Sequence, residues 1–334
     1  MYSVNWLFST HLPFEVHMIT PPNITLSEKH LRLARIFNRK ADHIFQAPQN
    51  THYRARITLR TGKDGSLGYY KPRSHIHIPI NEDDLAHEII NERLSKLGPA
   101  PVSLHSVSLR TDKKKVVMAI QERQKRDKNQ ILEWASPHVE GIALNGAVIW
   151  GSGELEIPSG GLTHLVSPGS FYQVNLDMNE QLVKRALELL TPLKPEHILD
   201  LYSGYGNLSF PFAQMGIPIE LIESNPSSLK DARINMKRFG FSAKLTQQNA
   251  HHFQAGQSIF DVALLDPPRT GAGKTLSEIA LTRPKAILYI SCNPHSFFKE
   301  MKSLSGYTLK NWELFDMFPN TPHIESLALF VRNS

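Results

Sequence analysis

An apolar segment that runs into a glycine-rich turn and a helix does most to constrain the fold of this sequence. Residues 198–202 read Ile-Leu-Asp-Leu-Tyr, residues 203–207 read Ser-Gly-Tyr-Gly-Asn, and a helix is expected over 208–215. Strand, glycine turn and helix, in this order, frame the ligand crevice of a doubly wound sheet. The pattern predicts an α/β fold, and an ordinary tight turn without a ligand is the alternative interpretation.

The spacing of this turn bears on the kind of ligand. It departs from the dinucleotide pattern G-x-G-x-x-G, because Ser209 stands at the third glycine position. Glu223 ends the next apolar run, 23 residues after Asp200, where an acidic residue typically binds ribose hydroxyls. A nucleoside without a pyrophosphate fits both observations, and S-adenosylmethionine is the cofactor that we expect.

The spacing of the apolar segments indicates that the chain has two parts. Later in the chain, helical stretches alternate with apolar runs at 197–203, 218–223, 260–266 and 285–291. This alternation is typical of a mostly parallel sheet with helices on both faces. We expect residues 1–160 to form a smaller α+β domain, which includes one strand over 139–150. Residues 161–334 should form a Rossmann-like domain whose last strand is antiparallel.

Positive charge is concentrated in the first part of the chain. Residues 1–150 hold 21 Lys and Arg against 14 Asp and Glu, whereas residues 151–334 hold 16 against 17. A basic half beside a neutral half indicates that the first binds a polyanion and the second does the chemistry. Alternation over 53–60 places Arg54, Arg56 and Arg60 on one strand face. These arginines are the candidate contacts to nucleic acid, and a solvated strand face is the alternative.

The cysteine count excludes several classes of site. Cys292 is the only cysteine, so an internal disulfide, an all-cysteine zinc site and an iron–sulfur cluster are excluded. The histidine pairs at 75/77 and 251/252 have no matching second pair of ligands, so no metal is expected. The sequence shows neither a signal peptide nor a membrane-spanning run, and it therefore predicts a cytoplasmic protein.

Three polar stretches each lie at an end of an apolar strand, where ligands bind in such sheets. They are Asp266-Pro-Pro-Arg269, Ser291-Cys292-Asn293-Pro294 and His323-Ile324-Glu325. Alone, Cys292 is most simply a buried core cysteine and Glu325 a surface carboxylate. The turn after Cys292, however, allows its thiol to face the crevice.

These stretches, taken together, resemble the RNA uracil-5-methyltransferase family. The matching segments are Phe-Tyr-Gln-Val-Asn at 171–175, DLYSGYGN at 200–207, Glu223, DPPRTG at 266–271, ILYISCNP at 287–294 and HIES at 323–326. The strand Tyr53-Arg-Ala-Arg56 also resembles the RNA-contacting region of that family. The resemblance implies a Rossmann-like class I methyltransferase domain preceded by an RNA-binding domain.

The resemblance also implies roles for single residues. It assigns Cys292 as the nucleophile that adds to C6 of uracil and Glu325 as the acceptor of the C5 proton. It assigns cofactor contacts to residues around the glycine turn and beyond it, namely Gln173, Tyr202, Gly204, Asn207, Glu223 and Asp266. The thiolate requires a lowered thiol pKa, to which the cofactor sulfonium or Arg269 can contribute. Alternatively, Arg269 binds an RNA phosphate or the uracil O4.

The sequence departs from the family pattern in two features. Many members carry an N-terminal barrel and a four-cysteine iron–sulfur site, and we expect neither here. The sequence begins too close to the central domain for a full barrel, and one cysteine cannot build the cluster. The expected partner is ribosomal or transfer RNA, and the protein is expected to be a monomer. A cytosine-5 RNA methyltransferase is one alternative, although its leading pattern uses a second cysteine. A non-catalytic RNA-binding or folding factor on the same scaffold is the other.

Overall fold

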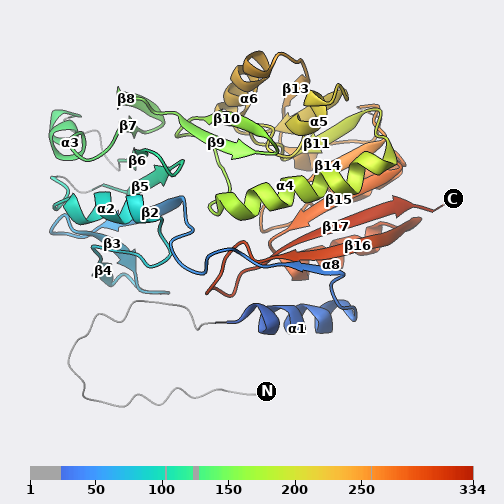
Figure 1. Cartoon of the computed structure of the whole chain (residues 1–334), viewed down its shortest axis with the longest axis horizontal. Helices are drawn as coiled ribbons and strands as arrows, with labels where there is room; N and C mark the ends of the chain where they lie inside the picture. Colours follow the sequence, from blue (N-terminus) through green and yellow to red (C-terminus); the bar gives the residue numbers. More distant parts are fainter. Residues whose placement is uncertain (1–23, 102–103, 123–127, 257, 334) are drawn as a thin grey trace.

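The computed structural model describes residues 24–101, 104–122, 128–256 and 258–333, which build two large sheets and a short hairpin (Figure 1). The larger sheet has the strand order β1-β16-β17-β15-β14-β11-β12-β13. Its strands are β1 (His43–Phe45), β11 (Ile198–Leu201), β12 (Ile219–Glu223), β13 (Lys244–Gln247), β14 (Val262–Leu265), β15 (Ala286–Ser291), β16 (Tyr307–Phe315) and β17 (Glu325–Arg332). Every pairing is parallel except the two that β17 makes. The expected mostly parallel sheet with an antiparallel last strand is confirmed.

Helices cover both faces of this sheet because its strands are apolar on both sides. One core takes side chains from α4 (Leu176–Leu190), α5 (Phe210–Gln214) and α6 (Pro226–Phe239). The core on the other face takes them from α1 (Leu26–Phe37), α7 (Lys274–Leu281) and α8 (Pro294–Glu300). Short 3-10 helices occur at Thr191–Leu193, Ala250–His252 and Met301–Ser303.

The seven-stranded sheet has the order β4-β3-β2-β5-β6-β7-β8 and packs against two helices. Its elements are β2 (Arg56–Thr61), β3 (Leu67–Tyr70), β4 (His77–Pro79), α2 (Glu88–Lys96), β5 (Ser106–Thr111), β6 (Val116–Gln121), α3 (Lys128–Ala135), β7 (Gly141–Leu144) and β8 (Ala147–Gly151). The single strand expected over 139–150 is wrong. Asn145 and Gly146 adopt φ values of 49° and 85°, and these left-handed conformations turn the chain into a two-strand hairpin.

The start of the described chain packs on the larger sheet rather than on the smaller one. β1 pairs in parallel with β16 at the sheet edge, and α1 lies against α8 (Figure 1). The hairpin of β9 (Leu155–Ser159) and β10 (Leu162–Val166) lies between the two large sheets in the chain, and its turn contains residues 160 and 161. A division of the chain at residue 160 remains a proposal.

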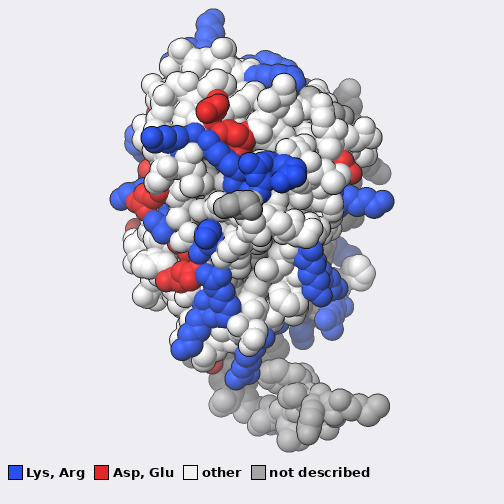
Figure 2. Space-filling model, turned by 90° about the vertical axis from the view of Figure 1, so that its right-hand side faces the viewer, with Lys and Arg blue, Asp and Glu red and all other residues white. Residues whose placement is uncertain are grey.

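Positive charge is not confined to the smaller sheet. Figure 2 shows the end of the molecule where β17 terminates, and Lys and Arg cover more of this face than Asp and Glu do. Because this face belongs to the larger sheet, charge alone does not locate a nucleic-acid surface. Among the described residues, no helix is long and apolar enough to cross a membrane.

Candidate active site

The candidate site lies at the carboxyl ends of the parallel strands. β11, β14 and β15 are neighbours in register, so the residues that follow them meet at one edge of the sheet. Asp266 follows β14, and Cys292 follows β15. Because β17 runs antiparallel to β15, its first residue, Glu325, is delivered to the same edge. The sheet thus brings together three side chains that the sequence analysis singled out separately.

Cys292 occupies a tight connection between β15 and α8. The Asn293 side chain caps α8 by accepting hydrogen bonds from the backbone N–H groups of His295 and Ser296. Its amide nitrogen donates to the carbonyl oxygen of Arg269 over 2.9 Å, which ties this turn to the one after β14. Cys292 is a half-buried free thiol that lines a cavity of about 460 Å³. The thiol therefore faces a space that a ligand can enter.

Glu325 is a buried carboxylic acid beside this thiol. It is 3% exposed, and its Oε1 atom has no hydrogen-bond partner among the described residues. Burial and the neighbouring Asp266 raise the pKa of Glu325 well above its usual value, while Arg269 acts in the opposite direction. An unpartnered acceptor with a raised pKa is suited to take up a proton from a substrate.

The pKa of the Cys292 thiol is raised to about 11 by burial and by the carboxyl groups of Glu325 and Asp266, and Arg269 only partly offsets them. A lowered thiol pKa, with help from the cofactor sulfonium or from Arg269, was expected, and the side chains of the protein alone do not produce it. Arg269 does lower it, but two nearby acids and desolvation outweigh a single exposed cation. The thiol of the protein alone is therefore protonated at neutral pH.

The glycine turn after β11 forms a second part of the site. Gly204 adopts φ 58° and has open space where a Cβ would stand, and its N–H donates to Glu223 Oε2 over 2.9 Å. Gly206 adopts φ 90°, and a Cβ there would approach the ring of Phe210 to 2.3 Å. The first glycine leaves the crevice open, and the second permits close packing beneath it.

The polar groups around this turn fit an S-adenosylmethionine molecule. Glu223 ends β12 as the sequence analysis expected, and Gln173 donates to Asp266 Oδ2 over 3.3 Å. Asp200 Oδ1 and Ser203 Oγ are buried without a hydrogen-bond partner in the described part of the chain. Acceptors left free beside a glycine turn suit the amino and ribose hydroxyl groups of the cofactor. No group of three or more metal-ligating side chains occurs among the described residues.

Two residues expected to contact the cofactor have their side chains engaged elsewhere. The amides of Asn207 and Asn179 bond each other in both directions at 2.8 and 3.0 Å, and Tyr205 also donates to Asn207. The hydroxyl group of Tyr202 lies 3.4 Å from His251. Both side chains hold the glycine turn to its surroundings, and their contact with a cofactor stays a prediction.

The basic strand alternates as expected, but its arginines differ in surroundings. Ile57 and Leu59 are buried, while Arg54, Arg56 and Arg60 lie on the other face and are half-buried. The Arg56 guanidinium stacks 4.8 Å from the centre of the Phe171 ring. Arg60 bonds the ring and the carbonyl oxygen of His105. An RNA contact remains a prediction for all three.

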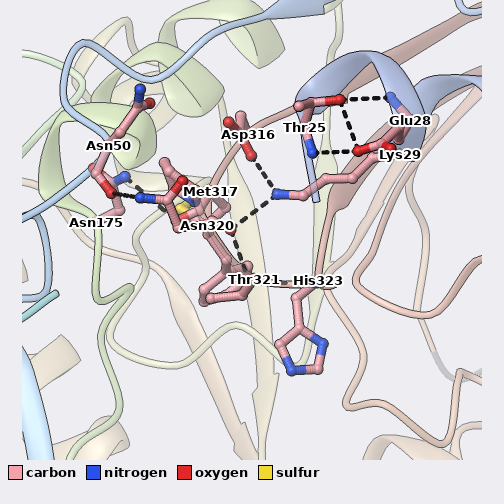
Figure 3. Close-up of polar contacts among 12 residues, drawn as sticks. Thr25, Glu28, Lys29, Asn50, Asn175, Asp316, Met317, Asn320, Thr321 and His323 are labelled. Carbon is pink, nitrogen blue, oxygen red and sulfur yellow. Dashed lines mark hydrogen bonds and ion pairs between the residues drawn. The ribbon is translucent and has the colours of Figure 1, made fainter. Parts of the chain in front are cut away.

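A polar network that was not predicted holds the loop between β16 and β17, which precedes Glu325. Lys29 of α1 is 3% exposed, and its ammonium group lies 2.7 Å from Asp316 and 2.9 Å from the carbonyl oxygen of Phe318 (Figure 3). Asn175 donates to Met317, and Asn320 donates to Asn50. These bonds fix the loop from β16 to β17. No signal in the sequence links Lys29 to Asp316, because 287 positions separate them.

Comparison with known proteins places this geometry in a family. The family model described as tRNA (Uracil-5-)-methyltransferase matches residues 243–333, and the methyltransferase small domain matches residues 161–282. The 23S rRNA (uracil(1939)-C(5))-methyltransferase RlmD of Shewanella woodyi is 30% identical over 329 residues, which cover 89% of this chain and 74% of the relative. The chain belongs to the RNA uracil-5-methyltransferase family. It is therefore an RNA methyltransferase, as the sequence analysis predicted.

Two further comparisons cover different shares of this chain. The RlmD of Shewanella halifaxensis is 38% identical over 172 residues, or 49% of this chain and 38% of the relative. The crystal structure of a Pyrococcus abyssi tRNA (uracil-54, C5)-methyltransferase with S-adenosyl-L-homocysteine aligns with a TM-score of 0.77. That alignment covers 92% of this chain and 82% of the other at 24% identity, and it confirms the α/β methyltransferase fold.

Proposed function

We propose that this protein methylates C5 of a uridine in 23S ribosomal RNA, at the position that corresponds to uracil 1939 of its relatives. Similarity to a ribosomal RNA enzyme over 89% of this chain supports the choice of RNA. The proposed reaction is supported by one observation: the Cys292 thiol lies next to the unpartnered carboxyl group of Glu325. Covalent activation of a pyrimidine needs one nucleophile and one proton acceptor, and this pair supplies both.

The chemistry follows from the two side chains. The Cys292 thiol first loses its proton to solvent, the resulting thiolate adds to C6 of uracil, and the electron pair of the C5–C6 double bond makes C5 nucleophilic. S-adenosylmethionine, when bound, supplies the methyl group that C5 takes up and leaves as S-adenosylhomocysteine. Glu325 then removes the proton from C5. The C5–C6 double bond re-forms as the Cys292 thiolate leaves, so atoms and charges balance without a further reactant.

We assign the cofactor side of the site to the groups around the glycine turn. Glu223 binds the ribose hydroxyls, Gly204 gives close backbone approach, and Asp266 with Gln173 borders the reacting groups. Asn207 and Tyr202 hold the turn in shape through their side-chain bonds. Arg269 is close enough to both Cys292 and Glu325 to lower their pKa values, and we assign it to the uracil or its phosphate.

We also propose that the protein is cytoplasmic. We propose that it acts as a monomer, because one chain supplies every group named here. The non-catalytic alternative predicts loss of Cys292 or Glu325, yet both side chains are present and adjacent. The cytosine-5 alternative needs a second cysteine for product release, and the sequence holds one.

The test is nucleoside mapping of RNA. Unmethylated transcripts of 23S rRNA and of tRNA are incubated with the protein and labelled S-adenosylmethionine, and the labelled nucleoside is located. Labelled 5-methyluridine at the position matching uracil 1939 supports the proposal. Label confined to tRNA would overturn the choice of RNA, and 5-methylcytidine would overturn the reaction.

A further inference from the structure

The cavity that contains the thiol is bounded by two parts of the chain that are far apart in sequence. One wall is the reactive edge of the sheet, with Cys292, Arg269 and His323. The opposite wall is helix α1, which contributes Arg32, Leu33 and Ile36 among others. The proposed chemistry uses only the first wall. The second wall is thus a surface facing the substrate to which no role has been given.

Helix α1 is held firmly enough to act as a binding wall. A capping box closes its first turn, in which Thr25 and Glu28 bond each other's backbone N–H groups (Figure 3). The buried Lys29–Asp316 ion pair fixes the end of its first turn. At its end, the Phe37 ring packs 4.4 Å from that of Trp312. The capping box closes the helix on itself, and Lys29 and Phe37 anchor it at two points to β16 and the residue that follows it.

The groups that α1 presents to the cavity suit one class of ligand. Arg32 is exposed, and no hydrogen bond or ion pair joins it to another residue in the described ranges. Ile36, one turn further along the helix, is half-buried and adds apolar surface to the cavity, and the buried Leu33 also lines it. The nearby carboxylate of Glu28 is occupied by the cap, because one of its oxygens accepts hydrogen bonds from Thr25. A free guanidinium beside apolar side chains matches a phosphate joined to a base.

We propose that α1 forms a subsite for the nucleotide next to the target uridine, in which Arg32 binds the intervening phosphate. This inference rests on the proposed function, because a uridine at Cys292 is part of a continuous RNA strand. Its neighbour must then occupy adjoining space, and the α1 side of the cavity is continuous with the space at Cys292. The base of that neighbour packs against Ile36.

The experiment compares Arg32→Ala with Arg35→Ala. Arg35 is exposed on the same helix and does not line the cavity, so it is a matched control. The probe is a synthetic fragment of 23S rRNA centred on the uridine corresponding to 1939, made with a neutral methylphosphonate at one flanking phosphate at a time. Binding of each fragment is measured at several salt concentrations, and methylation is measured in parallel.

If the subsite exists, a neutral methylphosphonate in place of one phosphate beside the target uridine should weaken RNA binding to the wild-type protein by about tenfold. Arg32→Ala should show the same loss with the normal RNA, a salt slope lower by about 0.7, and no further loss from that linkage. Arg35→Ala should behave as wild type. If Arg32→Ala matches Arg35→Ala, the subsite is wrong even where methylation proceeds. If the wild-type protein does not methylate the fragment, the proposed function fails. The binding measurements on the methylphosphonate fragments still test the subsite in that case.

Discussion

The Ser326 hydroxyl donates a hydrogen bond of 3.2 Å to the carbonyl oxygen of Ser291, its partner across the antiparallel pair of β17 and β15. This register places the next residue of one strand and the preceding residue of the other at the same edge of the sheet. Those residues are Cys292 and Glu325, and the carboxyl group of Glu325 is close enough to raise the pKa of the thiol. A shift of one residue would turn one of the two side chains to the other face.

Replacement of the thiol separates chemistry from cofactor binding. Cys292→Ala should lower methyl transfer by roughly 10⁴-fold or more, because no other cysteine is present to take over. Binding of S-adenosylmethionine should stay close to that of wild type, since Glu223 and Gly204 belong to a different turn. Single-turnover assays and calorimetric titration measure the two effects. Substantial methyl transfer by this variant would rule out covalent catalysis through Cys292.

The pH dependence of the reaction follows from the two raised pKa values. The thiol must lose its proton to add to uracil, and Glu325 must be ionised to accept one, so both requirements favour high pH. The single-turnover rate should therefore rise with pH through neutrality, because the thiol pKa of the protein alone is raised to about 11. Arg269→Ala should move the profile to higher pH, because Arg269 lowers both pKa values. A wild-type rate that is already flat below neutral pH would contradict this assignment.

The core of the fold could be predicted from the sequence because its signals are local, whereas the roles of Cys292 and Glu325 come from the family resemblance and stay predictions. Apolar runs marked β11, β12, β14 and β15, and the Thr25–Glu28 capping box marked the start of α1. Strand β13 (Lys244–Gln247) escaped prediction because it is short and polar at both ends. The hairpin of β7 and β8 was read as one strand, although Asn145-Gly146 is a turn signal.

Long-range relationships in the site could not be predicted. The contact of α1 with the loop before β17 depends on tertiary packing that joins opposite ends of the chain. The thiol pKa likewise depends on burial and on which charges surround Cys292, and sequence order specifies neither. The free acceptors of Asp200 and Ser203 became visible only once the surrounding hydrogen bonds were known.

The buried ion pair of Lys29 and Asp316, at the start of the loop from β16 to β17, should matter for stability. Lys29→Met leaves the buried Asp316 carboxylate without its cation and should lower the free energy of unfolding by about 3–5 kcal/mol. Denaturant titration measures the loss, and Lys40→Met, at an exposed position just beyond α1, is the control. The double variant Lys29→Met/Asp316→Leu should recover much of the loss. If Lys29→Met is as stable as the control, the pair is not important for folding.

The three arginines of the basic strand should differ in their roles, one in stability and two in RNA binding. Arg56 stacks on Phe171 and lies near Tyr172, so Arg56→Ala should lower the free energy of unfolding by about 1 kcal/mol. Arg54→Ala and Arg60→Ala should instead each lower the salt slope of RNA binding by roughly 0.7–0.9, if each contacts one phosphate. Filter binding across a salt series checks this. Unchanged affinity and slope in the triple Ala variant would identify a solvated strand face.

Glu325→Gln gives the sharpest test of the proposed mechanism, because it separates proton removal from the steps before it. Glutamine keeps the size of the side chain but cannot accept the C5 proton. The variant should still form the Cys292–C6 bond and transfer the methyl group, and it should then stall, because the thiolate leaves only after that proton is gone. A denaturation-resistant protein–RNA complex with labelled methyl should accumulate on gels, and it should be absent in the double variant with Cys292→Ala. Normal turnover would mean that another group is the base. Loss of activity without any adduct would place Glu325 in substrate binding or an earlier step.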